Sequence, residues 1–186
     1  MDSDGPTTIV LTVATADWRE AIDHLEERSE RIVAATLQHS TTASWLRRSE
    51  VSILLTHDDE IRELNRHYRG RDQSTNVLSF PNVDLDKGQA LASPSPGPLP
   101  SHQVLLGDIA MSFQRLSEEA DLYKKPLLDH FAHLLVHGML HLLGYDHQND
   151  QQAEVMERIE ESILSSLGMA APYAVRDSVD RLEALP

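Results

Sequence analysis

The sequence predicts an α/β domain of the α+β kind, in which about five helices pack on a mixed four-stranded sheet. Short apolar runs rich in β-branched residues alternate along the chain with longer segments of helical periodicity. A chain of 186 residues with 40% hydrophobic content can bury one core, so a single domain is expected over residues 1–186. No apolar stretch suits a signal peptide or a membrane span, which indicates a cytoplasmic protein without a membrane partner.

The first part of the chain reads as strand, helix, strand, helix. Residues 8–14 (TIVLTVA) are apolar and β-branched and predict a strand, and the acid-rich residues 17–38 follow with helical spacing of their apolar positions. Residues 51–55 (VSILL) predict a second strand. A helix then runs to about residue 68, and Gly70 ends it, because glycine readily adopts the left-handed conformation at a helix C-terminus.

The middle of the chain predicts two more strands separated by a long loop. Residues 75–80 (TNVLSF) form a short strand that Pro81 is expected to stop. Residues 82–102 turn to Pro, Ser and Gly, with SPSPGPLP at their centre, and predict a surface loop. Residues 104–111 (VLLGDIAM) predict the fourth strand, and an amphipathic helix follows over residues 112–122.

The last part of the chain predicts two helices. Pro126 suits the first turn of a helix that runs to Leu143, where Gly144 stops it. A final helix begins near Asp150 and ends before residue 168, and residues 169–186 form a polar, frayed tail.

Composition restricts the partners and the kinds of metal site. The chain has no cysteine, so a tightly held metal has to use His nitrogen and carboxylate oxygen. The formal net charge of −14 ordinarily argues against nucleic acid, because phosphate binding depends on Lys and Arg. The surplus acid lies near the two ends, however, and residues 62–72 hold four arginines against two acids. The middle of the chain is therefore locally basic.

Four histidines fall on one side of the helix expected from Pro126. At about 100° per residue, His130, His133, His137 and His141 lie within an arc of roughly 80°. Apolar residues fill much of the rest of this helix, so it is expected to be buried with its histidines lining a pocket. A buried imidazole needs a partner, and neutral imidazole is the commonest protein ligand for zinc.

The spacing selects three of these histidines as metal ligands. His137 and His141 are four residues apart on the helix, and Gly144 lets the chain turn so that His147 returns to them, which makes H-x3-H-x5-H. Three histidines leave a fourth zinc position open for water, as catalytic sites do. Gly138 stands where zinc proteases of this spacing carry their glutamate base, which argues against a peptidase.

The neighbouring polar residues have other expected roles. His130 and His133 are expected to be satisfied core residues or to support the ligands from behind. Asp146 either accepts the spare N–H of a ligand histidine or caps the turn, and Tyr145 is expected to pack.

Three segments together resemble the YbeY family of bacterial endoribonucleases: HGMLHLLGYDH (137–147), LLGDIAMS (105–112) and LNRHYRGRDQSTNVLSFP (64–81). The resemblance implies a small α/β domain, one Zn²⁺ per chain, and cleavage of single-stranded RNA. It further implies maturation of ribosomal RNA, notably the 3′ end of 16S rRNA, together with ribosome biogenesis and ribosome quality control. Ribosomal RNA, the ribosome or small-subunit proteins, and an assembly GTPase are the implied partners, and DNA is not expected.

The same resemblance assigns site residues. It implies His137, His141 and His147 as metal ligands and Arg69, within YRGRD, as the functional arginine, so that Arg69 and His137 are the expected catalytic residues. Asn76 stands where many relatives carry Asp. Residues 94–100 make the loop longer than in typical members, which can alter access to the cleft.

Arg69 also suits phosphodiester chemistry on physical grounds. A permanent cation just past a helix end can address a phosphate with its bidentate fork and stabilise the charge that builds during cleavage. Three neighbouring arginines are weaker candidates for phosphate contacts, and two strand-end residues are expected to border the cleft. These five residues are Arg62, Arg66, Arg71, Ser79 and Asp108.

The leading hypothesis is a zinc-dependent endoribonuclease, with two alternatives. A zinc hydrolase of another class, such as a peptidase, suits the acidic charge but lacks a glutamate at Gly138. A non-catalytic ribosome assembly factor would hold a structural metal. In the leading hypothesis the general base stays open between water activated by the ion, His133 and the 2′-hydroxyl of the RNA.

Overall fold

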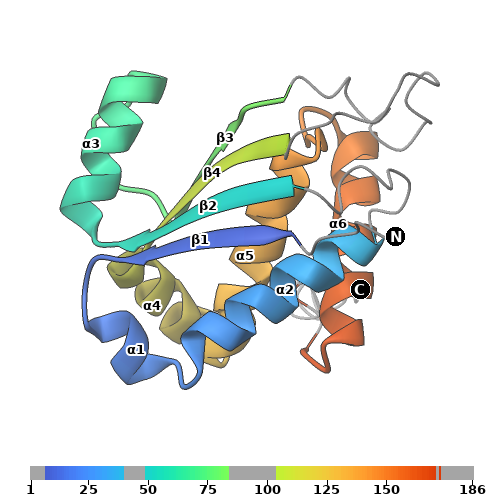
Figure 1. Cartoon of the computed structure of the whole chain (residues 1–186), viewed down its shortest axis with the longest axis horizontal. Helices are drawn as coiled ribbons and strands as arrows, with labels where there is room; N and C mark the ends of the chain where they lie inside the picture. Colours follow the sequence, from blue (N-terminus) through green and yellow to red (C-terminus); the bar gives the residue numbers. More distant parts are fainter. Residues whose placement is uncertain (1–6, 40–48, 84–103, 171, 173–186) are drawn as a thin grey trace, which may run out of the picture.

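Four strands form one mixed sheet in the order β1-β2-β4-β3 (Figure 1). The computed structural model describes residues 7–39, 49–83, 104–170 and 172. Its strands are β1 (Thr8–Val13), β2 (Ser49–Thr56), β3 (Val77–Pro81) and β4 (Val104–Ser112). β1, β2 and β4 are parallel, whereas the edge strand β3 pairs antiparallel with β4. The predicted mixed four-stranded sheet is confirmed.

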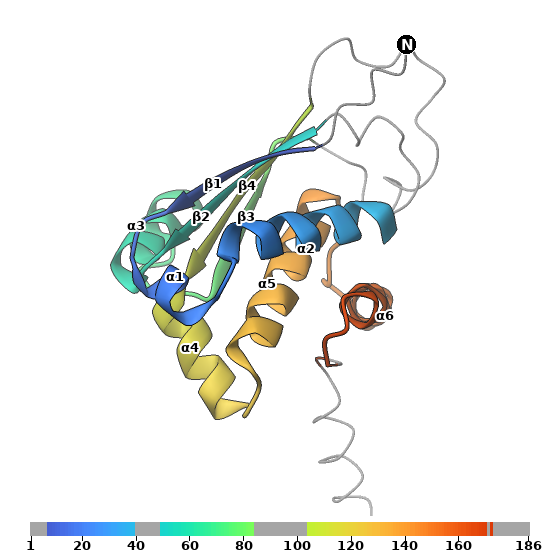
Figure 2. The same cartoon turned by 60° about the horizontal axis from the view of Figure 1, so that its bottom comes forward.

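Six helices surround this sheet in the described part of the chain. They are α1 (Asp17–Ala21), α2 (Leu25–His39), α3 (Asp58–Arg69), α4 (Phe113–Leu122), α5 (Leu127–Leu142) and α6 (Asp150–Ser166). α2, α4 and α5 lie against one face, and α6 packs on the outer side of α2 and α5 (Figure 2). α3 lies on the opposite face, where Ile61 packs with Leu78 and Ala110. None of the described helices is long and apolar enough to cross a membrane.

The single helix predicted over residues 17–38 is wrong, because the chain forms α1 and α2 instead. Ile22 is extended and His24 adopts a positive φ of 55°. The helix is therefore interrupted from Ile22 to His24, after α1 and before α2. The turn allows both Trp18 and Leu25 to be buried in the same core. Trp18 Nε1 donates to the Thr56 carbonyl at 3.0 Å, which fixes the side chain beneath the end of β2.

The third strand ends at Pro81, as predicted, and Pro81 is itself the last residue of β3, paired with Gly107. β3 is an edge strand, and an edge tolerates proline where no N–H has to reach a neighbouring strand. Gly107 has φ 141°, and a Cβ there would lie 2.2 Å from the Phe80 carbonyl oxygen, so only glycine allows this close pairing. Of the loop predicted at 82–102 and the tail predicted at 169–186, all but residues 82–83, 169–170 and 172 lie outside the described residues.

Candidate metal centre

Gly138 lets α5 approach the sheet closely beside the site. A Cβ at this position would lie 3.1 Å from Ser79 Oγ on β3 and 3.3 Å from two side-chain carbons of Ile109 on β4. A larger side chain would push the helix away from the edge of the sheet. The missing protease glutamate therefore has a structural reason as well, since even a Cβ here is in tight contact with side chains of β3 and β4.

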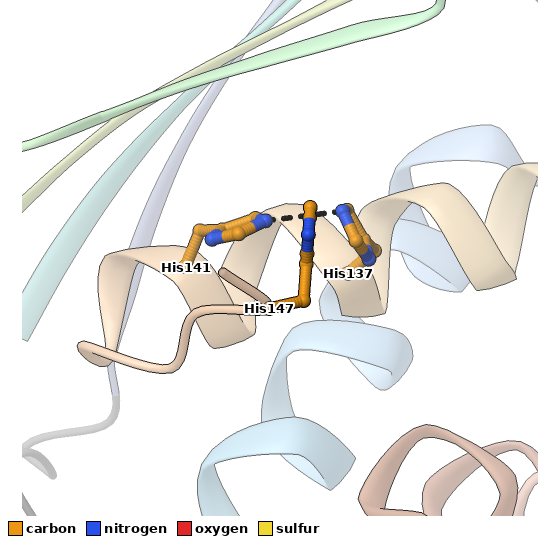
Figure 3. Close-up of side chains that lie close together, drawn as sticks. All are labelled: His137, His141 and His147. Atoms are coloured by element: carbon orange, nitrogen blue, oxygen red, sulfur yellow. Dashed lines mark hydrogen bonds between the residues drawn. The ribbon is translucent and has the colours of Figure 1, made fainter. Parts of the chain in front are cut away.

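His137, His141 and His147 converge from α5 and from the loop that follows it (Figure 3). His137 Nε2 and His141 Nε2 are 3.1 Å apart, and one nitrogen of each of the three side chains lies within 4.8 Å of the others. Gly144 makes this convergence possible, because its φ of 85° reverses the chain at the end of the helix. The structure thus brings together the three histidines that the spacing selected.

Hydrogen bonds on the far side of two rings orient their lone pairs toward one another. His141 Nδ1 lies 3.0 Å from the Tyr145 carbonyl oxygen, which can only accept, so Nδ1 carries the proton and Nε2 is a bare acceptor. His137 Nδ1 lies 2.7 Å from Glu160 Oε1, a carboxylate oxygen that accepts in the same way. Two acceptor nitrogens 3.1 Å apart repel each other unless a cation lies between them.

The electrostatics of the cluster also favour neutral imidazole. Burial, and then the charges of His137 and His147, lower the pKa of His141 from 6.5 to about 4. Zinc binds the neutral ring, so His141 is ready to ligate at neutral pH. Tetrahedral zinc separates its ligand nitrogens by about 3.3 Å, close to the His137–His141 distance. The donor set fits a zinc ion. His147 is the exposed member of the three, so its side chain has the most freedom to move into position for the ion.

Asp146 takes one of the two roles considered for it, capping of the turn. Its Oδ1 accepts the backbone N–H of His147 at 2.8 Å, and its Oδ2 accepts from the Gln148 amide at 2.5 Å. The Nδ1 atoms of His137 and His141 face Glu160 and the Tyr145 carbonyl instead of Asp146. The Tyr145 ring is 7% exposed and packs in the core, as predicted, and burial raises the pKa of its hydroxyl.

His130 is buried, His133 is partly buried, and both lie against carboxylates, as expected for supporting or core histidines. His130 Nε2 lies 2.8 Å from Glu119 Oε2, and the Asn76 amide donates to both oxygens of the same carboxylate at 3.0 Å. His133 Nε2 lies 3.4 Å from Glu160 Oε2. Glu160 therefore bridges His133 and His137.

Glu160 is the main site residue that the sequence reasoning missed. It is 1% exposed and lies on the buried side of α6, among apolar residues at helical spacing. A glutamate within the otherwise apolar positions Met156, Ile163 and Leu164 was the available signal, since a buried carboxylate requires a partner.

A cleft of about 650 Å³ joins the histidines to the basic segment. Arg69 and Arg71 line it together with His137, His141 and His147. Arg69 reaches across the edge of the sheet, where its Nη2 donates to the Ser79 carbonyl at 2.8 Å. The structure thus places the expected arginine and the expected ligands around one space.

The other cleft candidates divide into two groups. Ser79 and Arg71 line the cleft, whereas Asp108, Arg62 and Arg66 are absent from its described lining. Arg62 forms a two-bonded ion pair with Asp72, which raises the pKa of Arg62, and Arg66 pairs with Glu63. These two arginines are already neutralised on the surface, so Arg71 is the better phosphate candidate beside Arg69.

Comparison with known proteins agrees with the motif resemblance. The family model described as Endoribonuclease YbeY matches residues 12–168. A protein named Endoribonuclease YbeY from Sphingopyxis alaskensis is 42% identical over 170 residues, which cover 90% of this chain and 98% of that protein. A protein of the same name from Bradyrhizobium diazoefficiens is 43% identical over 171 residues, covering 92% and 87%.

Two further matches complete the comparison. An Endoribonuclease YbeY from Rhodopseudomonas palustris is 45% identical over 146 residues, which cover 78% of this chain and 70% of that protein. The solution structure of TM1509 from Thermotoga maritima is a looser match, with a TM-score of 0.49 and 23% identity over 86% of this chain and 91% of that one. On its family model and its relatives, this chain belongs to the endoribonuclease YbeY family.

Proposed function

We propose that this protein is a zinc-dependent endoribonuclease that cuts single-stranded RNA, with one zinc ion held by His137, His141 and His147. The observation that carries the proposal is the shared cleft, in which Arg69 and the three histidines face the same space. The names of the relatives support RNA as the substrate. A three-histidine metal site beside Arg69, which has no carboxylate partner among the described residues, suits phosphodiester cleavage, where negative charge builds on phosphate oxygens.

In this proposal the metal and the protein supply different parts of the chemistry. A bound zinc ion would act as a Lewis acid that polarises a phosphate oxygen or lowers the pKa of water. Arg69 holds the scissile phosphate, because its bond to the Ser79 carbonyl fixes the guanidinium at the cleft and leaves its other donors to form a fork. His137 takes part as a ligand whose ring is oriented by Glu160.

His133 is the least supported of the three possible general bases. It is absent from the described lining of the cleft, and its Nε2 lies 3.4 Å from the buried Glu160 carboxylate. A general base has to reach the proton that it removes, directly or through one water. We therefore favour water activated by the ion, or the 2′-hydroxyl of the RNA.

We further propose that the enzyme acts in the cytoplasm on ribosomal RNA, in 16S 3′-end maturation and ribosome quality control, as the family resemblance implies. The net charge of −14 repels free RNA over most of the surface. Ribosome or small-subunit proteins, together with an assembly GTPase, would deliver this acidic enzyme to its substrate.

The test is cleavage of a labelled single-stranded RNA by highly purified protein, beside His137→Ala, Arg69→Ala and a chelator-treated sample. We expect wild type to cut and the three altered samples to fail while they keep their circular dichroism spectrum. Arg62→Ala is the matched control and should cut like wild type, because Arg62 is paired with Asp72 away from the cleft.

Two outcomes would contradict the proposal. If His137→Ala and Arg69→Ala cut as well as wild type, the activity is a contaminant, and an assembly factor with a structural metal becomes the better account. If wild type instead cleaves peptides in a protease panel, the chain is a zinc hydrolase of another class despite Gly138.

A further inference from the structure

The last turn of α3 carries a large aromatic side chain on the surface. The Tyr68 residue is 63% exposed, and its ring centroid lies 5.2 Å from that of the partly buried Phe80 on β3. The centroid of the His67 ring lies 4.7 Å from that of the Tyr68 ring, in an edge-on arrangement. Tyr68 is therefore supported by two rings and still offers most of its surface to solvent.

Core packing accounts for Phe80 better than for Tyr68. Phe80 packs on the small apolar cluster of Ile61, Leu78 and Ala110 beneath α3. Tyr68 lies outside that cluster, so its ring is not part of the described core. A rigid exposed aromatic with few rotatable bonds is the usual element of a stacking surface for nucleic-acid bases.

Arg69 connects Tyr68 to the cleft. The Arg69 guanidinium lies 5.8 Å from the Phe80 ring centroid and donates to the Ser79 carbonyl, while it lines the same cleft as the histidines. Tyr68 and Arg69 thus share Phe80 as a common support. Tyr68 precedes Arg69 at the end of α3 and is absent from the described lining of the cleft, so a strand held by Arg69 would have to extend past that lining to meet the Tyr68 ring.

The charges around the ring suit a phosphate backbone. Arg71 lines the cleft just beyond Arg69, and neither appears in an ion pair among the described residues. Other large exposed apolar side chains, such as Leu122 and Tyr123, lie at the end of α4, on elements that do not line the cleft. Within the described residues, Tyr68 is the exposed aromatic side chain that lies next to an arginine of the cleft, Arg69.

We infer that Tyr68, backed by Phe80, is a stacking site for one unpaired RNA base next to the phosphate held by Arg69. This inference rests on the proposed endoribonuclease function and adds a base-binding position to it. Stacking requires only a π-face, so the site selects an unpaired base without selecting its identity. Double-stranded RNA, whose bases are already stacked in the helix, cannot use it.

The test is an abasic scan of a labelled single-stranded RNA, in which each nucleotide in turn is replaced by one that lacks its base. For wild type, KM should rise at one position near the cut, by about five-fold or more, the lower end of what one base–aromatic stack supplies. Tyr68→Ala should raise KM of the intact RNA by a similar factor, more than it lowers kcat. In this variant the sensitive position should disappear.

Two control variants separate stacking from other roles. Tyr68→Trp should restore wild-type KM and the sensitive position, because indole offers a larger stacking face. Tyr123→Ala removes another half-exposed tyrosine and should behave as wild type throughout. Circular dichroism and thermal unfolding of each variant check the fold.

The contradicting outcomes are distinct from failure of the function itself. If Tyr68→Ala leaves KM unchanged, or keeps the sensitive position, the stacking site is overturned while cleavage that depends on His137 and Arg69 stands. If Tyr68→Ala lowers kcat as Arg69→Ala does and leaves the scan unaltered, Tyr68 only supports Arg69, and the inference is wrong. If wild type neither binds nor cuts RNA, the proposed function fails, and the stacking site fails with it.

Discussion

The two halves of the histidine row on α5 have the same residue type on the same side of one helix, but different ring nitrogens face their carboxylate partners. In the first half, the Nε2 atoms of His130 and His133 face the carboxylates of Glu119 and Glu160. In the second half, His137 and His141 turn their Nε2 atoms toward each other across 3.1 Å beside the cleft.

The comparison shows that metal binding depends on which ring nitrogen faces a protein acceptor. A histidine can offer Nε2 to a metal only when the acceptor faces Nδ1. When a carboxylate faces Nε2, as at His130, that nitrogen is engaged by the protein and is not available to a metal. When the acceptors face Nδ1, as at His137 and His141, the proton is drawn away from the cleft and Nε2 is left for a metal. The predictions below test this division between the two halves.

The largest expected effect separates His141 from His130. His141→Ala should lower zinc affinity by more than about 100-fold, beyond the range known for supporting residues, because it removes one of three imidazole ligands. His130→Gln should retain about one zinc per chain and lower only stability. Elemental analysis after dialysis against a weak chelator measures this, and equal zinc loss in both variants would contradict the division.

The next effect concerns the position that holds the second half of the row against the sheet. Gly138→Glu should lower the free energy of unfolding by about 3 kcal/mol or more, because it overpacks the contact with Ser79 and Ile109 and buries a charge. Urea denaturation measures the change. Gly70→Asn is the control, since a Cβ there meets no atom within 4 Å and Asn tolerates its left-handed φ of 67°. Equal stability of Gly138→Glu and wild type would show that α5 does not need glycine here.

Two buried carboxylates give a smaller, matched comparison. Glu160→Gln should weaken zinc binding by about 10- to 100-fold, as loss of a supporting charge behind a ligand histidine does. Glu119→Gln should leave zinc affinity at the wild-type value, because its partners are His130 and Asn76. Competition with a coloured chelator measures the zinc affinity of both variants. An unchanged zinc affinity in Glu160→Gln would show that Glu160 does not position His137 for zinc.

A further comparison is a pH dependence that differs between the halves. Because the pKa of His141 is lowered to about 4, the unfolded chain binds more protons than the folded chain between pH 6.5 and about 4. The stability of the zinc-free protein should therefore fall as pH falls through this window, and His141→Asn should flatten the fall. Urea midpoints measured in chelator between pH 7.5 and 4.5 test it, and equal slopes in both proteins would contradict it.

Glu119, the α4 carboxylate that faces His130, contributes a pH dependence of stability at lower pH. Burial alone would raise its pKa, but the hydrogen bonds from His130 and Asn76 prevail and lower the pKa below 4.5. Its contribution to stability is present above pH 4.5 and is lost as pH falls below that value.

The parts of this site that were predictable from the sequence are the local ones. His137, His141 and Gly144 belong to one helix and its end, so spacing alone predicted which rings meet. Glu160 was not predicted, because its contact with His137 depends on how α6 packs on α5, and no local pattern carries that information. The strands were located near their observed positions, but the strand order depends on pairing between distant segments.

The most direct test of the central claim is X-ray absorption at the zinc edge of the purified, zinc-loaded protein. The account predicts three imidazole nitrogens at about 2.0–2.1 Å with a fourth, non-protein oxygen, and loss of one imidazole in His147→Ala. A spectrum with fewer than three imidazoles in wild type, or one that His147→Ala leaves unchanged, would contradict a metal centre made by His137, His141 and His147.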